Sequence, residues 1–257
     1  MKDSAQQEKS QSESGQWVKL GDGLRGYYAR PAGPGPFPSV LIYIEAYGLN
    51  AHFQRLTQRF AAAGFAALTP DLYDGAVYPY SDLPGAVGHM KRLDDERVLA
   101  QTVKALDFLA AQPEADGDAV AAVGFCMGGR LTFLASAALA SRFKAAAAFY
   151  GGGIAPATDF LGRKNLLGRV QDIKAPLLLW YGAEDQFILP DEHGRIAEAL
   201  SRAGKQYTLT VFPGTTHGFF CDDRVNYNND AAQRSFRATT AFFHEYLDAG
   251  ASPSKGL

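Results

Sequence analysis

Cys126 stands where a predicted strand turns sharply into a helix. It is the third residue of GFCMGG (124–129), which follows the apolar run 119–123 and precedes the helix-forming run 130–139. Glycines two positions before and after it are needed, because larger side chains would clash with the neighbouring backbone. The N-terminal end of the helix dipole also favours a thiolate there. The pattern therefore predicts a nucleophile elbow with cysteine in the usual place of serine.

Three further chemistry-bearing side chains follow the ends of other predicted strands. They are Glu45 after 39–44, Asp185 after 177–181 and His217 after 207–212. Functional groups of parallel α/β sheets gather at the carboxyl ends of the strands, so we expect these side chains to lie near Cys126. The chain order of nucleophile, acid and histidine is that of α/β-hydrolases.

These residue types have complementary roles in nucleophilic catalysis. Cys126 would attack a carbonyl carbon as a thiolate. His217 would take the thiol proton and later protonate the leaving group, while Asp185 would hold the imidazole tautomer and stabilise its charged form. The backbone N–H groups of Met127 and Ala46 are placed to hold an oxyanion.

Structural interpretations compete with these roles. A lone cysteine after a strand is usually a small core residue, which the flanking glycines disfavour here. Glu184 and Asp191 are alternatives to Asp185, although either could only start the next helix. Glu45 could be a strand-end carboxylate satisfied by backbone donors. We expect the remaining histidines to be surface residues: His52, His89, His193 and His244.

Alternating strands and helices surround these groups. Strands are predicted at 17–20, 24–29, 39–44, 65–69, 119–123, 145–150, 177–181 and 207–212. Helices are predicted at 51–63, 94–111, 130–139, 191–203 and 231–247. This alternation predicts a single-domain α/β-hydrolase fold, with a mostly parallel central sheet and helices on both faces. Segment 72–89 is rich in Gly, Pro and Tyr and is predicted as a lid or substrate-lining loop.

Composition limits the classes of partner. The chain has 257 residues, 47% of them hydrophobic, and a formal net charge of -2, so one sizeable core is expected. It has no basic block and no apolar run long enough to span a bilayer, so we expect neither nucleic acid nor membrane as a partner. No HExxH or paired CxxC motif occurs, and we expect no metal and no cofactor.

The ends of the chain differ from its centre. Residues 1–16 are polar and lack the apolar region of an export signal, so we expect a disordered tail, an α/β-hydrolase domain over 17–248 and a flexible tail over 249–257. The two cysteines, Cys126 and Cys221, are then expected to be reduced in a cytoplasmic monomer or homodimer.

Taken together, these motifs resemble the dienelactone hydrolase family. The segments concerned are GFCMGG at 124–129, GAED at 182–185, THGF at 216–219, IEAYGLN at 44–50 and AALTPDLY at 66–73. The resemblance extends over residues 17–248 and implies cofactor-free hydrolysis of lactones or activated esters by a Cys-His-Asp triad. It also implies that Glu45 contacts the resting thiol and accepts its proton when substrate binds.

One position departs from the family pattern. Members that cleave dienelactone carry an arginine four residues after the histidine, and this chain has Cys221 there. Arg224, Arg92 or Lys91 could substitute, but without such a clamp an anionic lactone loses a charge-assisted contact. Aromatic residues near the strand ends instead predict a pocket for neutral acyl or aryl groups: Tyr47, Tyr73, Tyr150, Phe187 and Phe219.

Three other functions remain open at this point. The same thiolate and oxyanion hole could attack other activated esters, including organophosphate triesters. Cys126 could also be the reactive thiol of a redox or electrophile sensor, with Cys221 as its resolving partner. A small-molecule binding protein without activity is the third alternative, and the intact triad argues against it.

Overall fold

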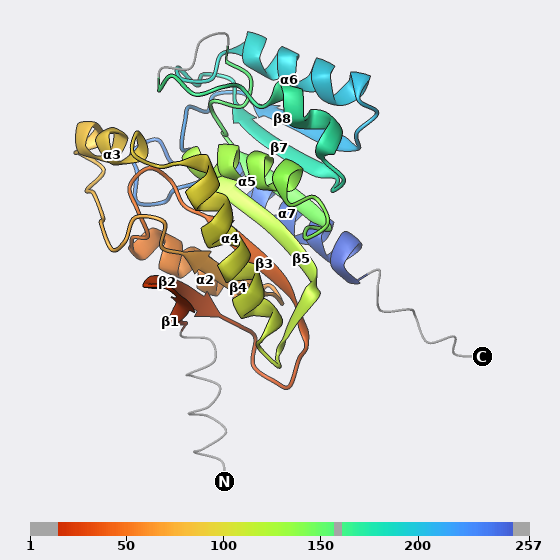
Figure 1. Ribbon diagram of the computed structural model, residues 1–257. Helices are drawn as coiled ribbons and strands as arrows, with labels where there is room; N and C mark the ends of the chain where they lie inside the picture. The colour runs from red at the N-terminus through yellow and green to blue at the C-terminus, as the bar shows by residue number, and fades with distance from the viewer. Residues whose placement is uncertain (1–14, 157–160, 249–257) are drawn as a thin grey trace.

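The computed structural model describes residues 15–156 and 161–248, and in it eight strands form one sheet (Figure 1). In chain order the strands are β1 (Gln16–Gly21), β2 (Leu24–Ala29), β3 (Phe37–Tyr43), β4 (Ala66–Pro70), β5 (Ala115–Phe125), β6 (Ala145–Phe149), β7 (Leu177–Gly182) and β8 (Tyr207–Phe212). Their order across the sheet is β1-β2-β4-β3-β5-β6-β7-β8. β1 and β2 pair antiparallel at one edge, and all neighbours from β4 to β8 are parallel. This arrangement confirms the predicted α/β fold.

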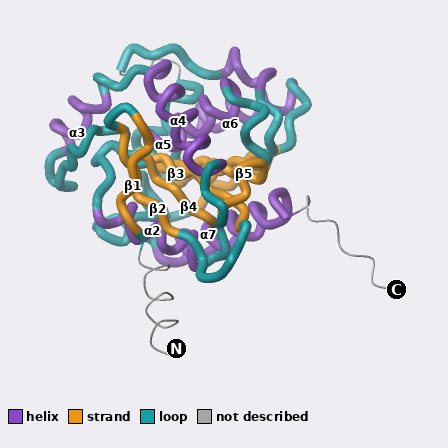
Figure 2. The backbone as a smooth tube through the Cα atoms, turned by 60° about the horizontal axis from the view of Figure 1, so that its bottom comes forward, coloured by secondary structure: helices purple, strands orange, loops and turns teal. Residues whose placement is uncertain are grey.

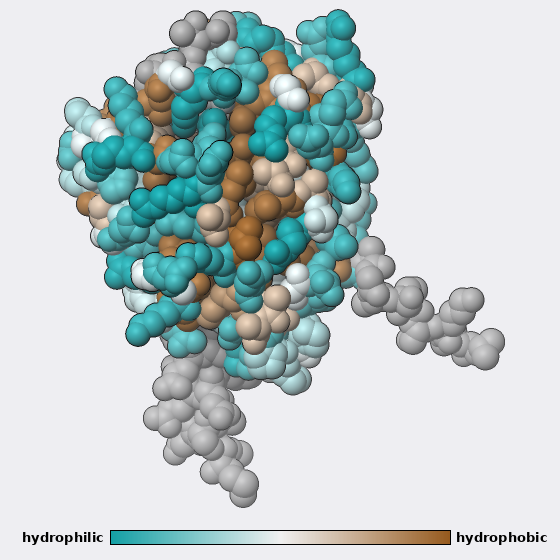
Figure 3. Space-filling model, viewed as in Figure 1, coloured by the Kyte–Doolittle hydropathy of each residue, from teal (hydrophilic) through white to brown (hydrophobic). Residues whose placement is uncertain are grey.

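Helices cover both faces of the sheet, as Figure 2 shows from a second direction. They are α2 (Ala51–Ala62), α3 (Leu83–Met90), α4 (Asp95–Ala110), α5 (Met127–Ala138), α6 (Pro190–Arg202) and α7 (Asn229–Leu247), with a 3-10 helix η1 (Leu167–Asp172). α4 and α5 pack together on one face, whereas α2 and α7 lie on the other. Seen from the α4–α5 side, a band of apolar surface runs between polar side chains (Figure 3).

The central strands are buried on both faces, which explains their continuous apolar sequences. Val40, Leu41 and Ile42 of β3 have no exposed surface, and β6 begins with four buried alanines. Small side chains on β6 let α5 lie close to the sheet beside the elbow. The loops that carry Glu45, Cys126 and Asp185 therefore follow buried strands, whereas the loop that carries His217 follows the edge strand β8.

Several details differ from the predictions. α3 occupies the end of segment 72–89 and extends to Met90. Its Gly and Pro residues hide the helical period, and Asp82 caps it by accepting from the Gly85 N–H at 2.9 Å. η1 was not predicted. β1 begins at Gln16, inside the expected tail, and the predicted tails at 1–14 and 249–257 lie outside the described residues. No helix of the described part is long and apolar enough to cross a membrane.

The prediction of surface histidines was wrong for two of the four. His52 and His193 are buried. His52 bonds Asp222 through Nδ1, and the His193 ring lies 4.2 Å from that of Tyr181. Each imidazole thus gains partners from a segment distant in sequence, which a single residue in a helix pattern does not reveal.

Candidate active site

Cys126 lies on a strained turn between β5 and α5. Its φ of 56° is in the left-handed region, which costs a non-glycine residue about 1–3 kcal/mol. A Cβ at Gly124 would lie 2.0 Å from the Gly128 carbonyl oxygen, and one at Gly128 would lie 2.3 Å from the Tyr43 carbonyl oxygen. Both glycines are therefore required, and the partly exposed thiol is held at the N-terminus of α5.

The structure brings Asp185, His217 and Cys126 together in that order. His217 Nδ1 lies 2.8 Å from Asp185 Oδ2, and Cys126 is close enough to His217 to raise the pKa of its imidazole. Asp185 Oδ1 accepts from the backbone N–H groups of Phe187 at 2.8 Å and Ile188 at 3.2 Å. Both Asp185 oxygens are thereby engaged, and the imidazole is held through its Nδ1.

The competing acids lie elsewhere. Glu184 is exposed, and Asp191 pairs with Arg195 at 2.6 Å on the surface of α6. Of the three acids, Asp185 alone is bonded to His217. The position of Asp185 in the loop after β7 is thus the sequence signal that distinguishes it from Glu184 and Asp191.

The charge state of His217 depends on its two partners. Burial lowers the pKa of the imidazole, but negative charge on Cys126 and the hydrogen bond that the ring donates to Asp185 outweigh it and raise the pKa to about 10. The charged form of the imidazole is therefore stabilised, as general acid catalysis by His217 would require.

Glu45 lies on the other side of the thiol and has different partners from those expected. It is buried just past the end of β3, and Oε1 accepts from the Tyr150 hydroxyl at 2.9 Å. Oε2 lies 3.6 Å from Arg224 Nη1 and makes no hydrogen bond. Glu45 thus has a tyrosine and an arginine as neighbours, and its contact with the resting thiol stays a prediction.

Arg224 is the cation that the structure places in the site. Its guanidinium carbon lies 5.6 Å from the Tyr47 ring centre and 5.8 Å from that of Tyr80. Burial lowers the pKa of the guanidinium, but negative charge on Glu45 and its other neighbours raises it above its usual value. Arg92 and Lys91, the other candidates, are exposed at the end of α3.

The dienelactone hydrolase family pattern matches residues 24–247, nearly all of the described chain. The chain belongs to the dienelactone hydrolase family. It is 32% identical over 233 residues to a "Putative carboxymethylenebutenolidase" of Methylorubrum extorquens, covering 89% of this chain and 79% of that protein. An Escherichia coli K12 protein of the same name is 31% identical over 239 residues, covering 88% and 84%.

Solved structures agree with this assignment. A Klebsiella pneumoniae protein described as a "Putative Dienelactone Hydrolase" superposes with a TM-score of 0.83 at 30% identity, covering 90% of this chain and 98% of that one. A metagenomic protein described as a dienelactone hydrolase-like promiscuous phosphotriesterase gives 0.74 at 26% identity, covering 91% and 98%. The protein is therefore a dienelactone hydrolase-like hydrolase.

The predicted aromatic residues of this family member divide into two groups. Around the thiol, Tyr47 packs edge-on against Tyr80 at 4.9 Å, and the Tyr73 hydroxyl donates to Met127 Sδ at 3.6 Å. Phe187 is 56% exposed and meets the His217 ring edge-on at 5.3 Å.

As Tyr150 does, Phe219 belongs to a second, fully buried group, and its lining of the pocket stays a prediction. It has no exposed surface and packs against the rings of Tyr150 at 5.2 Å and Phe212 at 5.6 Å. Phe219 therefore supports Tyr150 from the core. Tyr80 was missed, and the tyrosine-rich run at 78–80 is the signal that could have identified it.

The expected oxyanion donors are consistent with the fold. Met127 is the first residue of α5, so its N–H is one of the donors that a helix leaves free at its N-terminus. Ala46 follows Glu45 at the carboxyl edge of the sheet.

Cys221, the second thiol, is buried behind the site. Its Sγ lies 3.1 Å from the Tyr80 hydroxyl, and both cysteines are free. Burial and the nearby Glu45 raise the pKa of the Cys221 thiol to about 12. This thiol stays protonated at neutral pH and is therefore a poor nucleophile.

Proposed function

We propose that this hydrolase cleaves carboxylic esters or lactones through an acyl-enzyme on Cys126. The observation that carries the proposal is the hydrogen bond between Asp185 and His217 beside Cys126, which stands on a strained elbow and raises the pKa of the imidazole. The arrangement supplies a nucleophile, a proton carrier and a group that orients the carrier.

The reaction would take place in two halves. In the first, the Cys126 thiol gives its proton to Glu45, its sulfur bonds to the acyl carbon, and the N–H groups of Met127 and Ala46 hold the oxyanion. The C–O bond to the leaving group then breaks as the charged His217 donates its proton. In the second, water attacks the thioester while His217 accepts a proton. The C–S bond then breaks, which releases the carboxylic acid and restores the thiolate.

We also propose that Arg224 binds a carboxylate of the substrate. It lies three residues beyond the position where the family pattern has its arginine, yet its guanidinium reaches the site beside Glu45. An anion at Arg224 would compete with Glu45 for the guanidinium. The released Glu45 carboxylate, whose Oε2 makes no hydrogen bond, would then be free to take the thiol proton, as the family resemblance implies.

Thiol alkylation in the presence of substrate tests the proposed nucleophile. Iodoacetamide should abolish esterase activity with one equivalent bound at Cys126, and a slowly turned-over aryl ester should protect against it. Activity that survives stoichiometric alkylation of Cys126 would show that another group carries the reaction.

Hydrolysis of organophosphate triesters is a second candidate. It is favoured by the 26% identity to a protein described as a promiscuous phosphotriesterase. A thiolate beside an oxyanion hole can attack phosphorus as well as carbon. Release of nitrophenol from a dialkyl nitrophenyl phosphate, lost after Cys126 alkylation, would support this activity.

The sensor alternative is less favoured by the site. Its resolving thiol would be Cys221, which is buried, hydrogen-bonded to Tyr80 and held protonated. A Cys126–Cys221 disulfide after mild peroxide treatment, found by peptide mapping, would revive it.

A further inference from the structure

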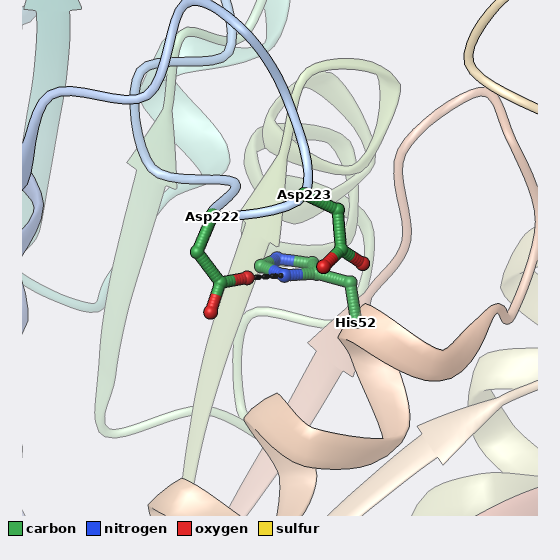
Figure 4. Close-up of side chains that lie close together, drawn as sticks. All are labelled: His52, Asp222 and Asp223. Carbon is green, nitrogen blue, oxygen red and sulfur yellow. Dashed lines mark hydrogen bonds and ion pairs between the residues drawn. The ribbon is translucent and has the colours of Figure 1, made fainter.

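The loop that carries Arg224 also contacts helix α2 on the side away from the site. Asp222 and Asp223 lie two residues and one residue before Arg224, and with His52 of α2 they form the cluster in Figure 4. Asp222 Oδ1 lies 3.0 Å from His52 Nδ1. Arg55, one turn along α2, bonds Asp222 at 3.2 Å and Asp223 at 2.7 Å.

This cluster has the residue types of a cation site, but a cation of the protein already occupies it. The same Arg55 nitrogen bonds one oxygen of each carboxylate. A metal ion would have to displace that guanidinium, so the cluster is better described as an ion-pair network between the loop and α2.

The two acids differ in the strength of their attachment. The Asp223–Arg55 pair is formed by half-exposed side chains, 38% and 48% accessible, and exposed pairs contribute little. Asp222 is itself 56% accessible, but it bonds an imidazole whose side chain is only 6% accessible and whose ring lies against Phe53 at 5.3 Å. Asp222 is therefore the acid that fixes the loop to a rigid element.

A short turn transmits this attachment to Arg224. The Arg224 N–H donates to the Cys221 carbonyl at 3.2 Å, so residues 221–224 form one turn with Asp222 inside it. On the other side of that turn, Cys221 contacts Tyr80, over whose ring the Arg224 guanidinium lies. A shift of Asp222 away from His52 would thus move the backbone from which Arg224 reaches Glu45.

We infer that Asp222 and His52 are positioning residues that set where Arg224 meets a substrate carboxylate. The inference rests on the anion-binding role proposed above for Arg224. It predicts a selective defect: recognition of an anionic substrate weakens, while the chemistry at Cys126, which needs His217 and Asp185, continues.

The test uses two nitrophenyl esters that differ in charge, the monoester of succinic acid and the butyrate. Asp222→Asn should lower kcat/KM for the anionic ester about tenfold through KM and change the butyrate value less than about twofold. His52→Gln breaks the same bond from the helix side and should give the same split. Asp223→Asn removes the same charge one residue away and is the matched control, expected to leave both substrates within about twofold.

Thermal unfolding of each variant separates positioning from folding. Equal losses on both esters would assign Asp222 a purely structural role and overturn the inference, as would an unchanged anionic-to-neutral ratio in both Asp222→Asn and His52→Gln. If Asp222→Asn does not fold, the anionic-to-neutral ratio of kcat/KM in His52→Gln tests the inference by itself.

Arg224→Met tests the anion-binding role on which this inference rests. If this variant leaves the ratio of kcat/KM for the anionic and neutral esters unchanged, both the anion-binding role and the positioning role are overturned. If the preference for the anionic ester is lost in Arg224→Met but kept in Asp222→Asn and His52→Gln, only the positioning role is overturned.

Discussion

The two sides of Cys126 are built differently. On the imidazole side, Asp185 and His217 are 2.8 Å apart, and each Asp185 oxygen has a hydrogen-bond donor. On the carboxylate side, Glu45 and Arg224 are 3.6 Å apart, and Glu45 Oε2 makes no hydrogen bond. The first side is complete before a substrate arrives, whereas the second has an unsatisfied oxygen and a cation only loosely paired with it.

From this difference we expect the two sides to have different functions. A pre-organised imidazole lowers the reorganisation needed when charge moves in the transition state. A guanidinium 3.6 Å from Glu45 can turn to a substrate anion, and the buried Glu45 carboxylate that it leaves would then need the thiol proton to become neutral, because an unpaired buried charge is strongly destabilising. Mutations on the imidazole side should therefore slow all substrates, and mutations on the carboxylate side should discriminate among them.

Cys126→Ala should have the largest effect. It removes the nucleophile shared by both sides, and we expect a loss in kcat of at least about 10⁴-fold, measured with nitrophenyl butyrate. The fold should persist, since the thiol is partly exposed and alanine adds no bulk at the elbow. A variant that keeps wild-type turnover would contradict the nucleophilic role.

Asp185→Asn tests the completeness of the imidazole side. The amide cannot stabilise the imidazolium or hold its tautomer, so kcat should fall about 10³- to 10⁴-fold for neutral and anionic esters alike. Glu184→Gln is the matched control in the same loop and should stay within about twofold. Equal activities of the two variants would mean that Asp185 is not the orienting acid.

Arg224→Met tests the discriminating side. Loss of a charge-assisted contact should reduce kcat/KM for the succinate monoester by about 10- to 100-fold, with a much smaller effect on the butyrate. Arg92→Met removes an exposed arginine and should change neither. The aromatic residues near the strand ends predict a neutral substrate. A wild-type enzyme that does not prefer the anionic ester would agree with that prediction and contradict the carboxylate-binding role of Arg224.

Glu45→Gln should raise the rate at which Cys126 is alkylated and lower the rate of hydrolysis. Removing a negative charge near the thiol favours the thiolate, so iodoacetamide should react with Cys126 about three- to tenfold faster at neutral pH. Hydrolysis should become slower if Glu45 accepts the thiol proton. Superimposable alkylation profiles from pH 5 to 9 and unchanged turnover would leave Glu45 with a structural role only.

Cys221 should show the smallest effect. Burial raises its pKa to about 12, so the thiol form persists at every pH below that value, and alkylation should be confined to Cys126 until the protein unfolds. Cys221→Ser should keep esterase activity within about threefold. Rapid modification of Cys221 in the folded protein at pH 7 would be inconsistent with its burial.

The same contrast explains what could be predicted from the sequence. The imidazole side follows from local patterns, because a buried strand fixes where its next residues emerge and the parallel sheet brings those ends together. The partners of Glu45 come from segments far apart along the chain, Tyr150 after β6 and Arg224 after β8. No local spacing connects them, and the burial of His52 was missed for the same reason.

The central claim is that Cys126 carries the acyl group, and trapping that intermediate tests it most directly. The enzyme would be mixed with a nitrophenyl ester, quenched in acid within milliseconds and mapped by mass spectrometry. The account predicts one acyl adduct, on the peptide that contains Cys126, formed at the rate of the nitrophenol burst and absent from Cys126→Ala. An adduct on another residue, or full turnover in Cys126→Ala, would contradict it.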